Sequence, residues 1–487
     1  MKLNKLLCPW IDDVISELEI TGISNDSRSV KAGDLFIAYP GHASDGRQFI
    51  PQAVKNGAAA VLFDPQGWKI SEPDTSTVYI PLANLVSKQA ELAARFYQNP
   101  SDSLYVTGVT GTNGKTTIAY QLAQAHELLS AKSAYIGTLG FGKADKLQSL
   151  ANTTPDAFCL QQLFSQFRQS DISQVCMEVS SHALDQGRTD CIRFSQGIFT
   201  NLTHDHLDYH HTMAEYAEAK AKLFAFPELK WAIVNQDDKY TPQILKSVSA
   251  DCQLLSYGVH QQADVRATEH EISLTGTRIK LNSPWGSHEL QIRALGYFNI
   301  YNALAIFSSL MAAGYPVSEV VDTMSKLRAA PGRMEIVSQE PYTIVDYAHT
   351  PDALKNVLET LNGVKKGKII AVFGCGGDRD KTKRPIMGQI ASDNADIVIM
   401  TSDNPRTEDP VQILDEIEQG IHKRDNLYKI ANREEAIAKA VSLASADDIV
   451  LVAGKGHESY QQVGSIRHHF SDQEVLNRYV NKVNECC

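Results

Sequence analysis

Short apolar runs alternate with helix-like stretches over most of this chain. Between residues 99 and 330 these runs fall at 103–107, 134–136, 175–179 and 231–234. Strands that alternate with helices in this way are typical of a doubly wound, mostly parallel α/β sheet. We therefore expect residues 99–330 to form a central α/β domain with such a sheet.

The segments on either side carry the same kind of pattern. Runs at 34–38 and 58–63, separated by Gly, Asp and Pro turns, predict a small α/β domain over residues 1–98. After a loop-rich join near 328–333, a second α/β series begins. Its expected strands are 343–345, 368–373, 397–400 and 448–452, which predict a Rossmann-like third domain over residues 331–487.

Length and composition fit this three-domain interpretation. The chain has 487 residues, 43% of them apolar and 21% charged, as in ordinary globular proteins. Its net charge of -11 argues against a general nucleic-acid binder. The eight cysteines are scattered without a Cys-x-x-Cys pair, and no apolar stretch is long enough to span a bilayer. We expect a cytoplasmic monomer that acts on small molecules, without nucleic-acid or membrane partners.

The segment 108–116 has the spacing of a phosphate-binding loop, with Gly, four residues and then Gly-Lys-Thr. A strand-like run precedes it and a helical pattern opens at 117–123, which is the context that the motif requires. In such a loop Lys115 meets the outer phosphates and the Thr116 hydroxyl serves Mg²⁺. The alternative is a tight strand-to-helix turn with a surface lysine.

Two further clusters suggest metal or phosphate chemistry in the central domain. Glu178 closes an apolar run at the expected carboxyl edge of the sheet, where it is either a Mg²⁺ ligand or an ion-paired residue. The segment 203–211 packs four histidines and two aspartates into nine residues, a composition that suits Mg²⁺, Mn²⁺ or zinc, or a polar solvent-facing loop. On the helix expected over 216–224, Lys220 by itself would be a surface lysine.

In the third domain, polar clusters follow the strand-like runs at 374–380, 403–406 and 454–458. Loops after parallel strands meet at one edge of a sheet, so Arg379, Arg406 and Glu458 are expected to face one pocket. Two guanidiniums and a carboxylate match a zwitterionic ligand, although each arginine alone would more often form a surface ion pair.

Over essentially its full length the chain resembles the Mur ligases, which add amino acids to the UDP-linked peptidoglycan precursor. The resemblance rests on the phosphate loop and on the motifs at 26–28, 152–154, 177–182, 205–210, 332–335 and 346–352, together with the three clusters above. It is strongest for the branch that adds meso-2,6-diaminopimelate to UDP-N-acetylmuramoyl-L-alanyl-D-glutamate, because an Asp-Asn-Pro-Arg motif accompanies that amino acid in the family.

The resemblance implies a role for each motif. For ATP it implies Gly111, Thr112, Asn113, Gly114, Lys115, Thr116, Thr117, Asn299, Asn302, Arg333 and Asp346. For the UDP-muramoyl-dipeptide it implies Ser27, His42, Ala43, Ser44, Asn152, Thr153, Thr154, Ser180, Gln186 and Arg188. For diaminopimelate it implies Arg379, Asp403, Asn404, Pro405, Arg406, Gly454 and Glu458.

The resemblance also implies the catalytic groups. Thr116 and Glu178 would hold one Mg²⁺ and His206 a second, while Lys220 falls where the family carries a carbamylated lysine whose carbamate serves that second metal. With Lys115, these residues would form an acyl phosphate on the D-glutamate γ-carboxylate at the expense of ATP. The alternatives are a sister ligase that adds lysine or glutamate, and a P-loop regulatory ATPase or nucleotide-sensing protein.

Overall fold

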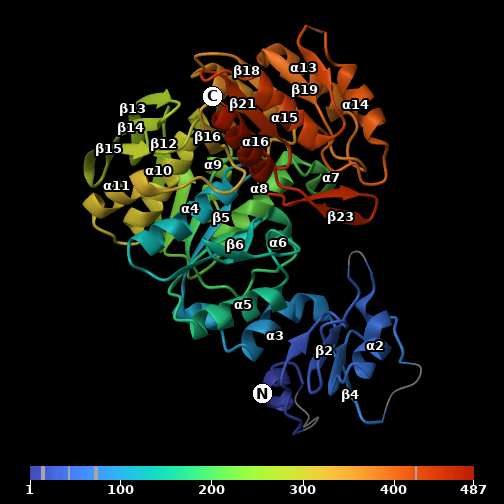
Figure 1. Cartoon of the computed structure of the whole chain (residues 1–487). Helices are drawn as coiled ribbons and strands as arrows, with labels where there is room; N and C mark the ends of the chain where they lie inside the picture. Colours follow the sequence, from blue (N-terminus) through green and yellow to red (C-terminus); the bar gives the residue numbers. More distant parts are fainter. Residues whose placement is uncertain (12–16, 42–43, 71–74, 423–424, 487) are drawn as a thin grey trace. The chain divides into compact units, whose positions relative to one another are not determined.

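The computed structural model describes residues 1–11, 17–41, 44–70, 75–422 and 425–486 (Figure 1). They divide into two compact units. One comprises residues 1–115 and 122–255, and the other comprises residues 116–121 and 256–487. His42 and Ala43 lie outside the described residues.

The amino-terminal part of the first unit is built on a four-stranded parallel sheet in the order β1-β2-β3-β4. Its elements are α1 (Leu3–Leu7), β1 (Ile23–Ser24), β2 (Leu35–Ala38), α2 (Ile50–Lys55), β3 (Ala60–Phe63), β4 (Val78–Pro81) and α3 (Gln89–Phe96). Alternate residues of β2 enter opposite cores: Leu35 joins the core that includes α1 and α3, and Phe36 the one that includes α2. The apolar runs at 34–38 and 58–63 contain β2 and β3.

The rest of the first unit contains the predicted parallel sheet, with strands ordered β11-β10-β5-β9-β6-β7-β8. The strands are β5 (Tyr105–Thr110), β6 (Ser133–Gly137), β7 (Gly140–Lys143), β8 (Lys146–Gln148), β9 (Gln174–Glu178), β10 (Phe194–Phe199) and β11 (Trp231–Asn235). The pairs from β11 to β6 are parallel, whereas β6, β7 and β8 form an antiparallel edge that the sequence pattern did not predict.

Helices α4 (Lys115–Leu128), α5 (Ala157–Gln169), α6 (Ser181–Asp185), α7 (Leu207–His210), α8 (Met213–Ala221) and α9 (Thr241–Leu245) connect these strands. The helix expected over 216–224 begins earlier, because the Thr212 hydroxyl caps it by accepting a hydrogen bond from the Glu215 N–H. It ends at Ala221, and a 3₁₀ turn, Lys222–Ala225, follows.

The second unit opens with an antiparallel meander. The meander consists of β13 (Val265–Ser273), β14 (Gly276–Ser283) and β15 (Gly286–Ile292), and β12 (Gln253–Gly258) precedes it and pairs with β13 in parallel. Helices α10 (Tyr297–Ala312) and α11 (Val317–Lys326) follow. The meander was not predicted, since its strands alternate buried and exposed positions and contain no long apolar run.

A six-stranded sheet in the order β16-β17-β21-β18-β19-β20 forms the carboxyl-terminal part of the second unit. The strands are β16 (Glu335–Gln339), β17 (Tyr342–Asp346), β18 (Ile369–Phe373), β19 (Ile397–Met400), β20 (Leu427–Lys429) and β21 (Ile449–Ala453). All pairs are parallel except β16 with β17. The four predicted strands of this part are confirmed.

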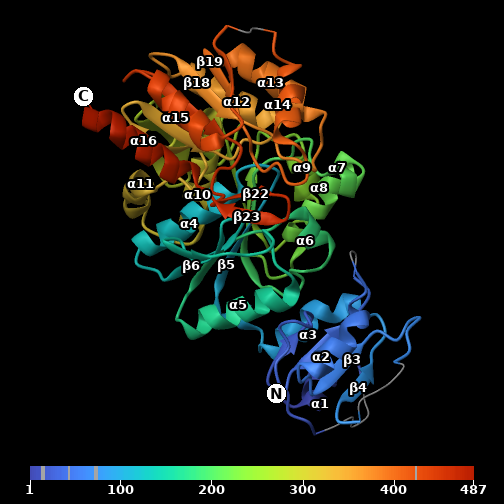
Figure 2. The ribbon, with the colours of Figure 1, turned by 45° about the vertical axis from the view of Figure 1, so that its right-hand side comes forward.

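Helices cover both faces of this sheet (Figure 2). They are α12 (Pro351–Asn362), α13 (Lys383–Asn394), α14 (Pro410–Glu418), α15 (Arg433–Leu443) and α16 (Asp472–Cys486). Ala371 packs into the core with α12, α13 and α14, whereas its neighbour Val372 packs into the core with α15 and α16. A strand buried on both faces is continuously apolar, which is why the sequence pattern identified β18.

Among the helices of the described residues, none is both long enough and apolar enough to cross a lipid bilayer.

Arg384, on α13, is completely buried and joins two acidic side chains to a loop at the sheet edge. Its guanidinium donates to Glu408 at 2.9 and 3.0 Å, to Glu416 at 2.6 Å and to the Gly376 carbonyl at 3.3 Å. The hydrogen bonds from Arg384 lower the pKa of Glu408 to about 2. Glu408 also accepts a hydrogen bond from the Asp378 N–H at 2.6 Å, so this cluster fixes the loop after β18.

We expect Arg384→Met to destabilise this part of the molecule by roughly 3 kcal/mol, because it leaves two carboxylates without their buried partner. Native-state hydrogen exchange of the α13 and α14 amides measures that loss locally. Arg478→Met, which removes an exposed arginine paired with Glu434, is the matched control and should leave the same amides unchanged. Equal protection of α13 in the Arg384 and Arg478 variants would contradict the prediction.

Candidate active site

The predicted phosphate loop lies between β5 and α4, as the motif requires. Strand β5 ends at Thr110 and α4 begins at Lys115. Gly111 adopts φ +150°, and a Cβ placed on it would lie 1.8 Å from the Thr200 hydroxyl, so only glycine fits there. The Asn113 carbonyl accepts a hydrogen bond from that hydroxyl at 2.6 Å, which ties the loop to the end of β10.

Two lysines converge on the carbonyl of Gly111. Lys115 Nζ donates to the Gly111 and Thr112 carbonyls at 2.9 and 2.8 Å, and Lys220 Nζ donates to the Gly111 carbonyl at 2.9 Å. Lys220 is only 1% exposed, so it is not the surface lysine that its sequence position alone suggested. Burial, and then the nearby positive charge of Lys115, hold the pKa of Lys220 well below its ordinary value.

Tyr216 lies beside Lys220 and is itself completely buried. Lys220 Nζ lies 4.4 Å from the centre of the Tyr216 ring, and the Tyr216 hydroxyl lies 3.3 Å from the Thr112 hydroxyl. The His210 ring stacks on Tyr216 at a centroid distance of 5.1 Å. Tyr216 thus connects the phosphate loop to the segment that contains the predicted histidine cluster.

Glu178 is the last residue of β9 and is almost completely buried. Its Oε1 accepts hydrogen bonds from the Tyr135 hydroxyl at 2.5 Å and the Thr138 N–H at 2.8 Å. Its Oε2 accepts one from the Thr138 hydroxyl at 3.2 Å. The structure therefore places this carboxylate at the carboxyl edge of the sheet, as predicted, with its orientation fixed by neutral donors.

The histidine cluster is folded around aromatic contacts. His206 has a left-handed backbone, with φ +54°, and its ring lies 5.1 Å from that of His182. His210 is buried and shares a 2.9 Å hydrogen bond with Ser181. Desolvation lowers the pKa of all three histidines. Across the described ranges, no group of three or more His, Cys, Asp or Glu side chains is arranged to hold a metal.

The residues implied for the muramoyl-dipeptide fall into one connected group and several separate ones. Arg188 donates hydrogen bonds to the Gln186 side chain at 2.5 and 2.9 Å and to the Thr154 carbonyl at 3.0 Å. The Thr154 hydroxyl donates to the Glu178 carbonyl and accepts a hydrogen bond from the Ser180 N–H. Thr153 contacts Thr138 through their hydroxyls at 3.1 Å.

Three further residues of that set stand apart from this group. Asn152 and Ser44 are exposed, and Ser27 is buried just after β1. The Ser44 carbonyl accepts a hydrogen bond from the Gly41 N–H at 3.0 Å.

In the second unit, the residues implied for the nucleoside lie in two places. Asn299 and Asn302 occupy the first turns of α10 and are joined by a 2.8 Å hydrogen bond. Asp346 ends β17, accepts hydrogen bonds from the Met334 and Ala348 N–H groups, and has a pKa raised by burial. Arg333 lies over the neighbouring Tyr347 ring at 4.5 Å.

The three polar clusters of the third domain do converge at one sheet edge, as predicted. They follow β18, β19 and β21, which are adjacent in the order β21-β18-β19. Arg406 Nη1 donates to the Gly377 carbonyl at 2.6 Å. A Cβ placed on Gly376 would lie 3.0 Å from that same nitrogen and 3.8 Å from Arg379 Cγ, so the two arginines flank one glycine.

Asn404 and Glu458 meet beside these arginines, where Asn404 Nδ2 donates to Glu458 Oε2 at 2.8 Å. Lys455 contacts both, and the predicted site did not include it. The available signal was its position between Gly454 and Gly456 directly after a buried strand, the same kind of setting as Lys115 in the phosphate loop.

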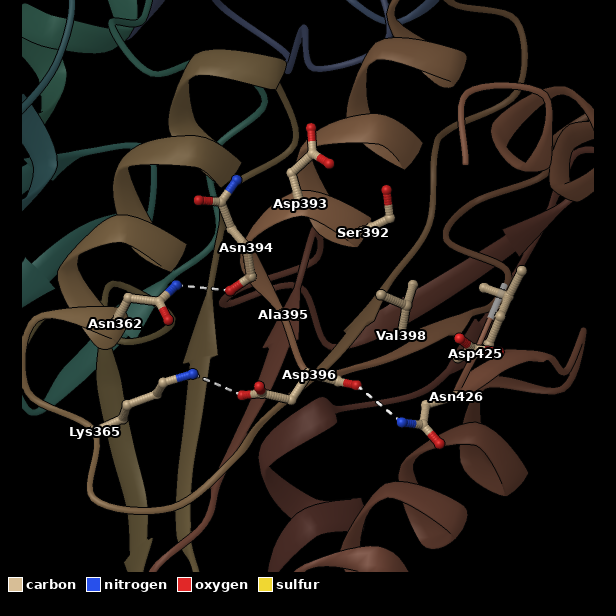
Figure 3. A pocket seen from close by; sticks show the side chains of 11 residues that line it. Asn362, Lys365, Ser392, Asp393, Asn394, Ala395, Asp396, Val398, Asp425 and Asn426 are labelled. Atoms are coloured by element: carbon tan, nitrogen blue, oxygen red, sulfur yellow. Dashed lines mark hydrogen bonds and ion pairs between the residues drawn. The ribbon is translucent and has the colours of Figure 1, made fainter. Parts of the chain in front are cut away.

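A polar cavity of about 320 Å³ lies at the opposite edge of this sheet, where Asp396 precedes β19 and Asn426 precedes β20. Figure 3 shows the side chains that line it. Its side chains bind one another: Lys365 pairs with Asp396 at 2.7 Å, and Asn362 donates to the Asn394 carbonyl at 2.7 Å. In open α/β sheets ligands bind at the carboxyl ends of the strands. The candidate site is therefore the edge that holds Arg406 and not this cavity.

Comparison with known proteins relates the chain to one family. Three descriptions of the Mur ligase family match it: the Mur ligase family catalytic domain over residues 19–97, the Mur ligase middle domain over 109–310, and the Mur ligase glutamate ligase domain over 332–456.

Two relatives share the name UDP-N-acetylmuramoyl-L-alanyl-D-glutamate–2,6-diaminopimelate ligase. The protein of Neisseria meningitidis serogroup B is 44% identical over 93% of both chains. That of Pseudomonas putida is 43% identical over 97% of this chain and 96% of its own.

A solved structure of a ligase with that name superimposes with a TM-score of 0.74 at 37% identity, covering 99% of each chain. The MurF ligase of Thermotoga maritima in complex with ADP shares the fold, with a TM-score of 0.67 at 18% identity over 97% of this chain and 99% of its own. Matches along three successive segments, and close relatives over nearly the whole length, show that this chain belongs to the Mur ligase family.

Proposed function

We propose that this protein joins meso-2,6-diaminopimelate to the D-glutamate γ-carboxylate of UDP-N-acetylmuramoyl-L-alanyl-D-glutamate, with ATP as the energy source, in the cytoplasm. The proposal rests on one observation: Arg406, Arg379 and Glu458 lie close together at one sheet edge of a Mur ligase. Arginine forks bind carboxylates, and a carboxylate binds an ammonium. Diaminopimelate offers one carboxylate more than lysine does.

The reaction we propose has two steps. A γ-carboxylate oxygen of the D-glutamate attacks the γ-phosphorus of ATP, the bond to the leaving ADP oxygen breaks, and an acyl phosphate forms. The neutral amine of diaminopimelate then attacks the acyl carbon, and the tetrahedral intermediate collapses with loss of phosphate and of the amine proton. No protein nucleophile is needed, so the chain acts by positioning and by charge.

Lys115 is the group we assign to the transferring phosphate. Its ammonium rests on the Gly111 and Thr112 carbonyls, within the loop that would surround a triphosphate. A phosphate oxygen carries more negative charge than a carbonyl and would draw the ammonium outward from the loop. Asn299, Asn302, Arg333 and Asp346 are assigned to the nucleoside and its phosphates from the family resemblance.

We assign one Mg²⁺ to Thr116 and Glu178 and a second to His206 and the carbamate of Lys220. Two of these groups suit a hard cation. Hydrogen bonds fix the orientation of the Glu178 carboxylate, and the lowered pKa of His206 favours its neutral form, which can bind a metal. An unmodified Lys220 does not fit, because its ammonium would repel the cation. Carbamylation replaces that charge with an anion, so the fit requires the modification. Bound Mg²⁺ would neutralise charge on the phosphates.

An assay of ADP release tests the proposal. With the UDP-muramoyl-dipeptide, ATP and Mg²⁺ present, diaminopimelate should trigger ADP release, and mass spectrometry should detect one added diaminopimelate residue per dipeptide. Release with lysine and none with diaminopimelate would identify a lysine-adding ligase instead. A rate of ATP hydrolysis that is the same with and without either amino acid would indicate a regulatory ATPase.

A further inference from the structure

Lys455 carries a completely buried ammonium at the edge of the third-domain sheet. It follows β21 and is flanked by Gly454 and Gly456, whose φ values are +114° and +54°. An ammonium has three N–H donors and no acceptor. The structure supplies three acceptors: Asn404 Oδ1 at 3.2 Å, Glu458 Oε2 at 3.1 Å and the Tyr460 carbonyl at 2.5 Å.

These contacts determine how the two pocket side chains are oriented. Because Lys455 only donates, it must face the oxygen of the Asn404 amide, and the Gln462 N–H donates to that same oxygen at 2.8 Å. The amide nitrogen of Asn404 is then directed to Glu458 Oε2. Lys455 and Asn404 therefore both hold the same oxygen of Glu458, which fixes the direction of its carboxylate.

The loop backbones have separate supports. Arg433 is buried, pairs with Asp472 at 2.7 Å, and donates to the Ser402 and Ala453 carbonyls at 3.4 and 3.1 Å. The hairpin of β22 (Tyr460–Val463) and β23 (Ile466–His469) holds the Arg406 backbone, since Arg406 N–H donates to the Gln462 carbonyl at 3.1 Å. Lys455 thus orients the Asn404 and Glu458 side chains, and its bond to the Tyr460 carbonyl adds one further support at the start of β22.

We propose that Lys455 is a positioning and specificity-determining residue for the incoming amino acid, an inference that rests on the proposed function. It presents Glu458 to the ammonium of the amino acid and adds a fixed positive charge beneath the pocket. Diaminopimelate, with two carboxylates and two ammonium groups, has no net charge, whereas lysine has a net charge of about +1 near neutral pH. A buried cation disfavours the cationic ligand, so Lys455 selects against lysine.

The test is Lys455→Met, which removes the charge and keeps most of the side-chain length. We expect the KM for diaminopimelate to rise by roughly tenfold or more, because Glu458 loses its buried donor. The KM values for ATP and for the UDP-muramoyl-dipeptide should stay within about twofold, since a misdirected Glu458 touches neither. The ratio of kcat/KM for diaminopimelate over lysine should fall. A general loss of structure would move all three KM values and would leave that ratio unchanged.

Two further variants complete the design. Lys365→Met removes an ion-paired lysine at the opposite edge of the same sheet and should leave every constant unchanged. Lys455→Arg keeps the charge but not the compact three-donor geometry, so the KM for diaminopimelate should rise while the preference over lysine persists. If Lys455→Met is poorly folded, the Arg variant still tests both roles: an unchanged KM for diaminopimelate overturns the positioning role, and a lost preference over lysine overturns selection by charge.

The outcomes separate the two proposals. A wild-type protein that does not ligate diaminopimelate overturns the proposed function. A wild-type protein that does, combined with an unchanged KM and an unchanged preference in both Lys455 variants, overturns only the role of Lys455.

Discussion

Lys220→Ala should lower kcat for ligation by at least about a hundredfold, the loss typical when a fixed charge is removed from a catalytic site. The buried Lys220 amine has a pKa held well below its usual value, so more of it is neutral than in an exposed lysine at the same pH. Only the neutral amine attacks CO₂, forming a nitrogen–carbon bond and releasing a proton. The product is the anion that the proposed Mg²⁺ site requires.

Two measurements separate a missing carbamate from a disturbed fold. Incubation with ¹³C-bicarbonate should give a carbamate NMR signal in the wild type that is absent from Lys220→Ala. Formate or acetate should partly restore activity to the variant, because a small carboxylate can occupy the space left by the side chain. Lys230→Ala, which removes an exposed lysine of the same unit, should match the wild type in both. Full activity of Lys220→Ala would rule out the carbamate.

Burial explains which strands the sequence could predict. Strands such as β18 and β21 are covered on both faces and are therefore continuously apolar. Strand β20 has only three residues, and β23 is exposed along its whole length, so neither has an apolar run to detect. The hairpin that holds Arg406 was missed for this reason, although its contacts help to shape the pocket.

For the charged residues of the site, the sequence predicted the position along the sheet edge but not the burial. Strand order brings the clusters after β18, β19 and β21 together, and that could be anticipated from the parallel pattern alone. The burial of Lys220 and Lys455 could not, because a lysine in a helix or after a glycine has the same local sequence whether it faces solvent or the interior. Only tertiary contacts, with the Gly111 carbonyl in one case and Asn404 and Glu458 in the other, distinguish them.

Arg406→Ala should reduce kcat/KM for diaminopimelate at least about a hundredfold and leave that for lysine nearly unchanged. The side chain is half-buried, and one of its five N–H donors is occupied by the Gly377 carbonyl. The guanidinium lies next to Arg379, so the two arginines can share the carboxylates of a ligand that has two of them. Lysine lacks the distal carboxylate and loses nothing when Arg406 is removed.

The backbone at position 406 makes alanine a suitable replacement. Arg406 has φ +52°, a conformation that is equally strained for arginine and alanine, so the substitution adds no backbone cost. Arg406→Lys should recover little of the loss, because a point charge cannot bind a carboxylate through two parallel hydrogen bonds. Arg478→Ala, at an exposed arginine of α16, should keep wild-type kinetics. If diaminopimelate and lysine lost efficiency equally in Arg406→Ala, the arginine would support the loop and not select the amino acid.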